Sequence, residues 1–214
     1  TEQFAGSEKN SMGFDLTIVE QLQWGRFLRS HYKRSMLQLL DMYSHLDAWY
    51  GMAMSVKQYG LSFPQFVTEN QPMLEVKGLY HILLNTPVDY DIRLDPDRNF
   101  LFLTGANMAG KSTFIKSVGT AVFLAHIGMG VPAQHMHLSL FDGLLSNINV
   151  ADNLHKGESY FYNEVQRIKS TVTKIADGRK WLILIDELFK GTNVEDAMKC
   201  SSTVIEGFLK IYNS

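Results

Sequence analysis

The spacing of apolar positions changes three times along this chain of 214 residues. From Phe14 to about Tyr59, apolar residues recur at intervals of three and four, which predicts a long helix with one apolar face. That face consists of Leu39, Met42, Leu46, Trp49, Ala53 and Val56. We expect the stripe to pack into a core and Gly60 to end the helix.

Between Phe66 and Leu94 the apolar runs are short and are interrupted by proline and glycine, which predicts irregular strands and turns. The run Asn99–Thr104 then predicts a short buried strand, and residues 113–126 predict a helix. Five consecutive apolar residues, Trp181–Ile185, suit a parallel strand that is covered on both faces. The fold class predicted from these patterns is α/β.

Residues 105–112 read Gly-Ala-Asn-Met-Ala-Gly-Lys-Ser, which fits the phosphate-binding (Walker A) pattern Gly-x-x-x-x-Gly-Lys-Ser. Gly105 and Gly110 let the backbone curl so that several N–H groups point at one anion. Lys111 would reach the β- and γ-phosphate oxygens, and the Ser112 hydroxyl would bind Mg²⁺. The alternative is a glycine-rich turn that precedes Lys-Ser by chance. The predicted strand and helix on either side favour a true P-loop.

Two carboxylates, Asp186 and Glu187, follow the apolar strand directly, as in a Walker B motif. A P-loop nucleotidase needs a carboxylate near the metal and a group that orients water. We expect Asp186 to hold Mg²⁺, directly or through water, and Glu187 to act as the base or water-positioner for attack on the γ-phosphate. The alternative is a strand followed by a solvated turn, and the P-loop upstream weighs against it.

Composition narrows the possible partners. The net charge of −2 argues against this piece being the main DNA-binding surface, because neutralising phosphates needs clustered Lys and Arg. The single cysteine, Cys200, excludes a disulfide framework and suits a reducing cytoplasm. The longest apolar stretches are far shorter than a membrane span, so we expect a cytoplasmic location and no membrane partner.

Four motifs then occur in a fixed order. Residues 104–113 read Thr-Gly-Ala-Asn-Met-Ala-Gly-Lys-Ser-Thr, and Val-Pro-Ala follows at 131–133. Residues 151–164 contain Ala-Asp-x-Leu and Gly-x-Ser-x-Phe-x-x-Glu, and residues 186–192 read Asp-Glu-x-x-x-Gly-Thr. In these motifs residues 46–212 resemble the MutS mismatch-repair ATPases, a branch related to ABC-type ATPases. The match indicates a divergent, bacterial MutS-like protein.

The resemblance assigns roles to single residues. Ser159 matches the family's signature serine, which approaches the γ-phosphate in the neighbouring subunit's site, although it would also serve as a helix cap. Glu187, Lys111 and Ser159 are then the expected catalytic residues. Tyr90, or else Val88, falls where the family stacks a side chain on adenine; the alternative is that Tyr90 packs on the core. The expected ATP-binding residues are Gly105, Ala106, Asn107, Met108, Ala109, Gly110, Lys111, Ser112, Thr113 and Tyr90, and the expected Mg²⁺ ligands are Ser112 and Asp186.

The resemblance also implies an organisation. Residues 1–60 would be a helical segment at the end of the family's lever region. Residues 61–214 would be a P-loop ATPase domain of MutS/ABC type that stops before the strand carrying the switch histidine. Such a domain hydrolyses ATP to ADP and phosphate with Mg²⁺ and couples dimer switching to DNA binding. The implied partners are ATP or ADP, a second MutS-like subunit in a homodimer, and DNA through the full-length protein.

The chain also departs from the family pattern. The family arginine before residue 151 is missing from residues 145–150, and no Phe-x-Glu mismatch wedge occurs. Asn193 and Asp196 lie where the family has a dimer-spanning loop, or they are a turn residue and a helix N-cap. Two alternatives follow. One is a MutS-related protein that controls recombination, against which Met108 counts. The other is a nucleotide-gated assembly module with little hydrolysis.

Overall fold

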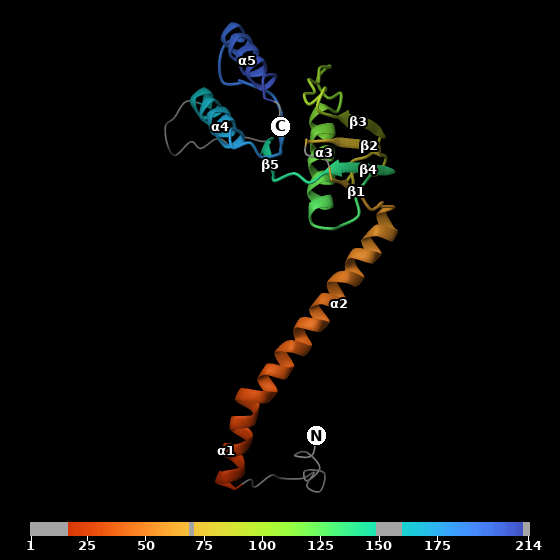
Figure 1. The fold of residues 1–214 in the computed structure, drawn as a ribbon, viewed down its shortest axis with the longest axis vertical. Coiled ribbons are helices and arrows are strands. Elements are labelled where there is room, and N and C mark those ends of the chain that lie inside the picture. Colours follow the sequence, from red (N-terminus) through yellow and green to blue (C-terminus); the bar gives the residue numbers. More distant parts are fainter. Residues whose placement is uncertain (1–16, 69–70, 149–159, 212–214) are drawn as a thin grey trace. The chain divides into compact units, whose positions relative to one another are not determined.

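The computed structural model describes residues 17–68, 71–148 and 160–211, and the chain divides into two compact units, Thr1–Gly51 and Met52–Ser214. The first unit contains α1 (Ile18–Phe27), the π-helical turn η2 (Leu28–Tyr32) and the start of α2 (Lys33–Tyr59) (Figure 1). Thr17 begins α1 through a capping box, because its hydroxyl accepts from the Glu20 amide and its own amide donates to the Glu20 carboxylate. The predicted long helix is therefore present, with a π-helical turn within it.

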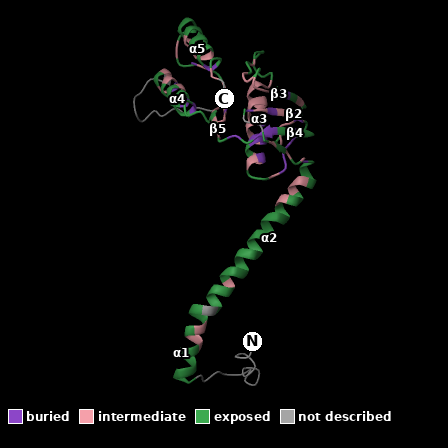
Figure 2. Cartoon of the chain, viewed as in Figure 1, coloured by how far each residue is buried: buried purple, intermediate pink, exposed green. Residues whose placement is uncertain are grey.

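The apolar stripe of this helix is not buried. Leu39, Met42, Leu46 and Trp49 are each about 60% exposed, and Figure 2 shows α1 and α2 mostly in the colour of exposed residues. A helix buries an apolar face only against another element. Residues 18–51 form one continuous run of helix, so within the described part of the first unit no second element covers this face. The predicted packing of the stripe into a core is wrong for Leu39, Met42, Leu46 and Trp49, whereas Val56, near the end of the helix, is half-buried.

Gly60 ends α2 as predicted. Its φ of +63° is left-handed, and the amide of Leu61 donates to the carbonyl of Val56 at 3.0 Å. This bond closes a Schellman motif, in which a left-handed residue after the helix lets the next amide reach back to a carbonyl of the last turn. Leu61 is buried, so the cap also starts the core of the second unit.

A four-stranded mixed sheet follows, in the order β1-β4-β2-β3. Its strands are β1 (Gln65–Val67), β2 (Leu74–Leu79), β3 (Tyr90–Leu94) and β4 (His135–Ser139). β1 is parallel to β4, and the other pairs are antiparallel. The register aligns Val76 with Ile92 and Met136, and these three side chains are buried on one face. The predicted short strands between Phe66 and Leu94 are confirmed.

A second sheet pairs β5 (Gly143–Asn147) with β6 (Trp181–Ile185) in parallel. β6 is the strand predicted from the five apolar residues. Leu182 and Leu184 are buried, whereas the residues that alternate with them are only half-buried. The strand and its parallel pairing are confirmed, but the predicted coverage of both faces is only partly seen.

Helix α3 (Lys111–His126) joins the two sheets in one hydrophobic core. Its residues Val118, Ala121 and Val122 belong to the same buried cluster as the strands of the larger sheet and as Leu184 of β6, and Figure 2 shows buried residues on α3 and the neighbouring strands. At Gly119, an added Cβ would lie 2.6 Å from Leu184 Cδ1, so β6 approaches the helix backbone directly. The mixed α/β class is confirmed.

Two further helices complete the second unit, α4 (Tyr160–Ile175) and α5 (Val194–Phe208). Asn193 is the N-cap of α5, because its side-chain oxygen accepts from the amide of Asp196 at 2.9 Å. The alternative in which Asp196 is the helix N-cap is wrong, because Asp196 is the third residue of α5. None of the helices in the described ranges is both long enough and apolar enough to span a bilayer.

The predicted strand Asn99–Thr104 is wrong in this structure. Residues 99–106 have no regular secondary structure, and Leu101 and Phe102 are exposed. A strand requires a ladder of hydrogen bonds with a neighbour, and β6 pairs with β5 instead. The apolar residues of this segment line a cavity, which explains why the segment is hydrophobic although it forms no strand.

Candidate functional site

The glycine-rich loop lies immediately before α3, as the motif predicted. Gly105 has a φ of +154° and Gly110 a φ of +90°, both of which favour glycine. Met108 between them has a left-handed φ of +65°, a strained conformation for a residue with a side chain. Its side chain is fully exposed. The loop is therefore curled and accessible to a ligand.

Lys111, the first residue of α3, folds back over this loop. Its Nζ donates to the carbonyl of Gly105 at 2.7 Å and to the carbonyl of Ala106 at 2.8 Å. The ammonium group thus bridges the start of the loop and the start of the helix. Because the helix N-terminus adds unpaired N–H groups and partial positive charge, the whole arrangement suits an anion.

Asp186 and Glu187 follow β6. The amide of Asp186 donates to the carbonyl of Asn147 at 3.2 Å, which extends the β5–β6 pairing by one residue. Glu187 is exposed and has a left-handed φ of +58°. Its carboxylate forms an ion pair with Lys190. Such an exposed pair contributes about 0–1 kcal/mol, so a ligand can displace it.

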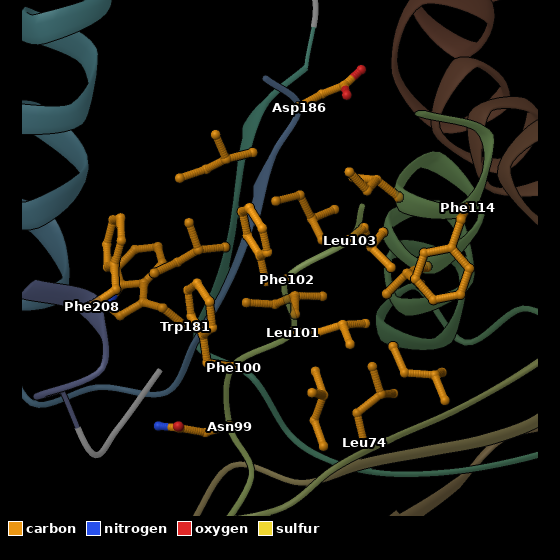
Figure 3. A pocket seen from close by; sticks show the side chains of 18 of the residues that line it. Leu74, Asn99, Phe100, Leu101, Phe102, Leu103, Phe114, Trp181, Asp186 and Phe208 are labelled. Atoms are coloured by element: carbon orange, nitrogen blue, oxygen red, sulfur yellow. The ribbon is translucent and has the colours of Figure 1, made fainter. Parts of the chain in front are cut away.

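One cavity of about 500 Å³ joins these groups. Lys111, Asp186 and Glu187 all line it, together with a larger apolar set from residues 99–103, α3, β6 and α5. Figure 3 shows Phe100, Leu101 and Phe102 between β6 and α3, with Asp186 near the end of the strand. Residues that are 75 positions apart in sequence therefore line one space.

Tyr90, the predicted adenine-stacking residue, lies close to the loop. Its ring packs edge-on against Phe114 of α3, with 5.3 Å between the ring centroids. A Cβ added at Gly110 would lie 3.6 Å from the Tyr90 hydroxyl oxygen. Tyr90 is half-buried and packs against the core, which agrees with the core-packing alternative. Stacking on adenine stays a prediction.

The predicted metal ligands are of the right chemical type. Ser112 is half-buried in the first turn of α3, and Asp186 is half-buried at the cavity. Among the described residues no group of three or more His, Cys, Asp and Glu side chains could hold a metal. A hydroxyl and one carboxylate fit Mg²⁺ that shares its remaining positions with water and phosphate oxygens. Thr113 follows in the same turn, and the predicted catalytic Ser159 lies outside the described residues.

Sequence reasoning gave no role to Glu164, although it matched a motif position. In the structure its carboxylate accepts from the amides of Lys190 and Gly191, both at 3.1 Å. Glu164 is 7% exposed and lies three positions after Phe161 on α4, on the stripe that also buries Thr171 and Ile175. The sequence signal that marks Glu164 is a carboxylate on the apolar stripe of an amphipathic helix. A buried carboxylate needs hydrogen-bond donors or a positive charge beside it, so such a residue is expected to make specific contacts.

Comparison with known proteins identifies the family. Residues 101–214 match the family model described as MutS domain V. The chain belongs to the MutS family. The protein named DNA mismatch repair protein MutS from Shouchella clausii is 35% identical over 181 residues, which is 82% of this chain and 20% of that protein. The protein of the same name from Thermotoga maritima is 31% identical over 183 residues, 84% of this chain and 22% of that protein.

A third MutS relative, from Oleidesulfovibrio alaskensis, is 29% identical over 211 residues, which is 95% of this chain and 23% of that protein. This MutS chain thus spans about a fifth of the length of the relatives that it matches. The match to MutS domain V spans the glycine-rich loop at 105–112, Asp186, Glu187 and Glu164. The expected membership in the MutS family is confirmed.

Proposed function

We propose that this chain is the ATP-binding and ATP-hydrolysing domain of a MutS-like mismatch-repair protein. Gly105 to Thr113 would bind the phosphates of ATP, and Tyr90 would contact adenine. Ser112 and Asp186 would hold Mg²⁺, which neutralises phosphate charge when bound. Glu187 would orient or deprotonate the attacking water. Ser159 from a second copy would complete the site, so that ATP closes a dimer whose state the full-length protein couples to DNA binding.

The observation that carries this proposal is the shared cavity. Lys111, Asp186 and Glu187 come from two separate motifs, and all three line the same space of about 500 Å³. Phosphoryl transfer needs a cation at the phosphates and carboxylates at the metal and the water within one site. The curled, exposed loop beside this cavity supports the binding of a phosphate chain.

A second candidate is a nucleotide-gated assembly module that binds ATP but hardly hydrolyses it. The ion pair between Lys190 and Glu187 favours it, because a carboxylate held by a lysine is less available to water. In this alternative, ATP binding alone would change the association of subunits. The two candidates share the nucleotide site and differ only in turnover.

The first experiment measures Mg-ATP binding by calorimetry in the wild-type chain and in Lys111→Ala. Charged hydrogen bonds contribute about 1.5–3 kcal/mol each, so we expect affinity to fall roughly 10–100-fold. Lys116→Ala, on the same helix but away from the loop, is the matched control and should bind as the wild type does. Unchanged affinity in Lys111→Ala would sink the proposal.

The second experiment separates the two candidates. Glu187→Gln should keep ATP binding and lose hydrolysis, and sedimentation with Mg-ATP should then show a shift from monomer to dimer. Wild-type chain that binds ATP without releasing phosphate would favour the assembly module. Bound nucleotide without any shift in sedimentation would contradict dimer switching by this chain.

A further inference from the structure

The loop after β6 has a strained backbone. Glu187 and Phe189 have φ values of +58° and +56°, although neither is glycine. Left-handed conformations of this kind persist only where neighbouring contacts enforce them. In the proposed function, Glu187 orients or deprotonates the attacking water. Whatever enforces this backbone therefore also sets the position of that carboxylate.

Helix α4 supplies two such contacts from one face. Phe161 packs against Phe189 with 5.6 Å between the ring centroids, and Phe189 is 5% exposed. One turn further along the helix, the Glu164 carboxylate accepts from the amides of Lys190 and Gly191. The aromatic pair fixes a side chain of the loop, whereas the carboxylate fixes its backbone.

The contacts continue from Glu164 to Glu187 through one residue. Lys190, whose amide is bonded to Glu164, lies three residues after Glu187, so this bond holds the backbone turn that carries the Glu187 carboxylate. Bonds from amides to an ionised acid are charge-assisted and stronger than neutral ones. Burial of Glu164 strengthens them further, because little water competes for its oxygens.

We infer that Glu164 is a positioning residue for Glu187, which it holds in place for hydrolysis through the backbone of Lys190 and Gly191. This inference rests on the proposed ATPase function and assigns Glu164 no contact with ATP. Loss of the hydrogen bonds from the Lys190 and Gly191 amides to Glu164 should therefore slow ATP hydrolysis and leave nucleotide binding intact. A residue that only stabilised the fold would lower the number of ATP-binding sites and the apparent kcat together, because only folded protein binds ATP, whereas loss of positioning lowers kcat per binding site.

The test compares phosphate release and ATP binding in three variants of the chain. In Glu164→Gln one carboxylate oxygen becomes an NH₂ group that faces an amide donor, so one bond is lost. Glu164→Asp keeps the charge but shortens the side chain by one methylene. Glu206→Gln makes the same glutamate-to-glutamine change at an exposed position on α5 and is the matched control. Circular dichroism melts report whether each variant is folded.

We expect kcat to fall tenfold or more in Glu164→Gln, with KM and the Kd for ATP within twofold of wild type. Glu164→Asp should lose less, and Glu206→Gln should lose nothing. An unchanged kcat, or a parallel loss of kcat and ATP affinity, in the folded variants overturns the inference. If Glu164→Gln does not fold, Glu164→Asp decides by the same criteria. Failure of the proposed function appears separately, as a wild-type chain that does not hydrolyse ATP, and overturns both.

Discussion

The Nε2 atom of His126 accepts a hydrogen bond from the backbone amide of Phe141 at 3.0 Å. The Nδ1 atom of the same ring lies 2.8 Å from the carbonyl oxygen of Val122. An amide only donates and a carbonyl only accepts, so the ring carries its proton on Nδ1 and is neutral. His126 thereby fastens the C-terminal end of α3, the helix that begins at the glycine-rich loop, to the segment that leads into β5.

Replacing His126 with phenylalanine tests this link. The variant keeps an aromatic ring beside Phe66 and Phe141 but leaves the part-buried Phe141 amide without its acceptor. We expect the free energy of unfolding to fall by about 1–3 kcal/mol, measured by urea denaturation. His45→Phe is the control, because His45 makes the same ring-to-carbonyl contact on exposed α2 and should change stability by about 0.5 kcal/mol or less. Equal losses would contradict the link.

Alanine substitutions at Gly110 and Gly128 test the backbone of the proposed phosphate-binding loop. Both have left-handed φ values, +90° and +79°, and they flank the two ends of α3. Neither lacks space for a methyl group, since the nearest atom to an added Cβ is 3.6 Å away at Gly110 and beyond 4 Å at Gly128. Alanine at either position should cost about 1–2 kcal/mol of stability through backbone strain. Only Gly110→Ala should also weaken ATP binding, and calorimetry on both variants would reveal an unexpected loss at Gly128.

Gly143 at the start of β5 faces Trp181 at the start of β6. An added Cβ would lie 2.2 Å from the indole ring, so Gly143→Ala must displace the tryptophan. We expect a loss of about 1–3 kcal/mol in unfolding free energy. Gly207→Ala, on α5 with open space around it, should instead be neutral or stabilise by up to about 1 kcal/mol. Thermal unfolding of the two variants measures the contrast, and a stable Gly143→Ala would refute the close approach.

Asp177 makes the stability of this strand depend on pH. The indole N–H of Trp181 donates to its carboxylate at 2.9 Å, as does the amide of Arg179. These bonds, chiefly the one from Trp181, hold the pKa of Asp177 below its usual value. The stabilisation is therefore full above about pH 3.9, the ordinary aspartate pKa, and is lost as pH falls through the lowered folded pKa.

Asp177→Asn removes the titrating group and should be less stable than wild type at pH 7. The difference in melting temperature between the two proteins should shrink as the pH is taken from 5 towards 3. Trp181 fluorescence, in chains with phenylalanine at Trp24 and Trp49, reports the same bond. A stability difference that does not change with pH would exclude the Asp177 carboxylate as its source.

The helices and the site motifs were predictable because their signals are local. Apolar spacing gave α2 and β6, and the glycine pattern gave the loop before α3, since each depends on residues within one turn or one strand. The segment Asn99–Thr104 was mispredicted because a strand depends on a partner, and sequence does not state which strand β6 will accept.

The same reason explains why Glu164 had no predicted role. Its partners are backbone amides of Lys190 and Gly191, and every residue except proline has such an amide, so no side-chain pattern marks them. Most of the stripe on α2, which was predicted to be buried, is exposed. Helical period shows which side chains share a face, but it does not show what covers that face.

In the part of the chain that the structure describes, Met108, Glu187 and Phe189 keep a left-handed backbone although each has a side chain. At the exposed Met108 and Glu187, glycine would relieve this strain without opening a cavity, so a laboratory selection for heat resistance alone would be expected to enrich glycine at these two positions. The variants that survived heating best would then lack the Glu187 carboxylate. Directed evolution of this chain towards higher melting temperature therefore needs a second screen for phosphate release, or it will select well-folded proteins that lack the residue proposed to orient the attacking water.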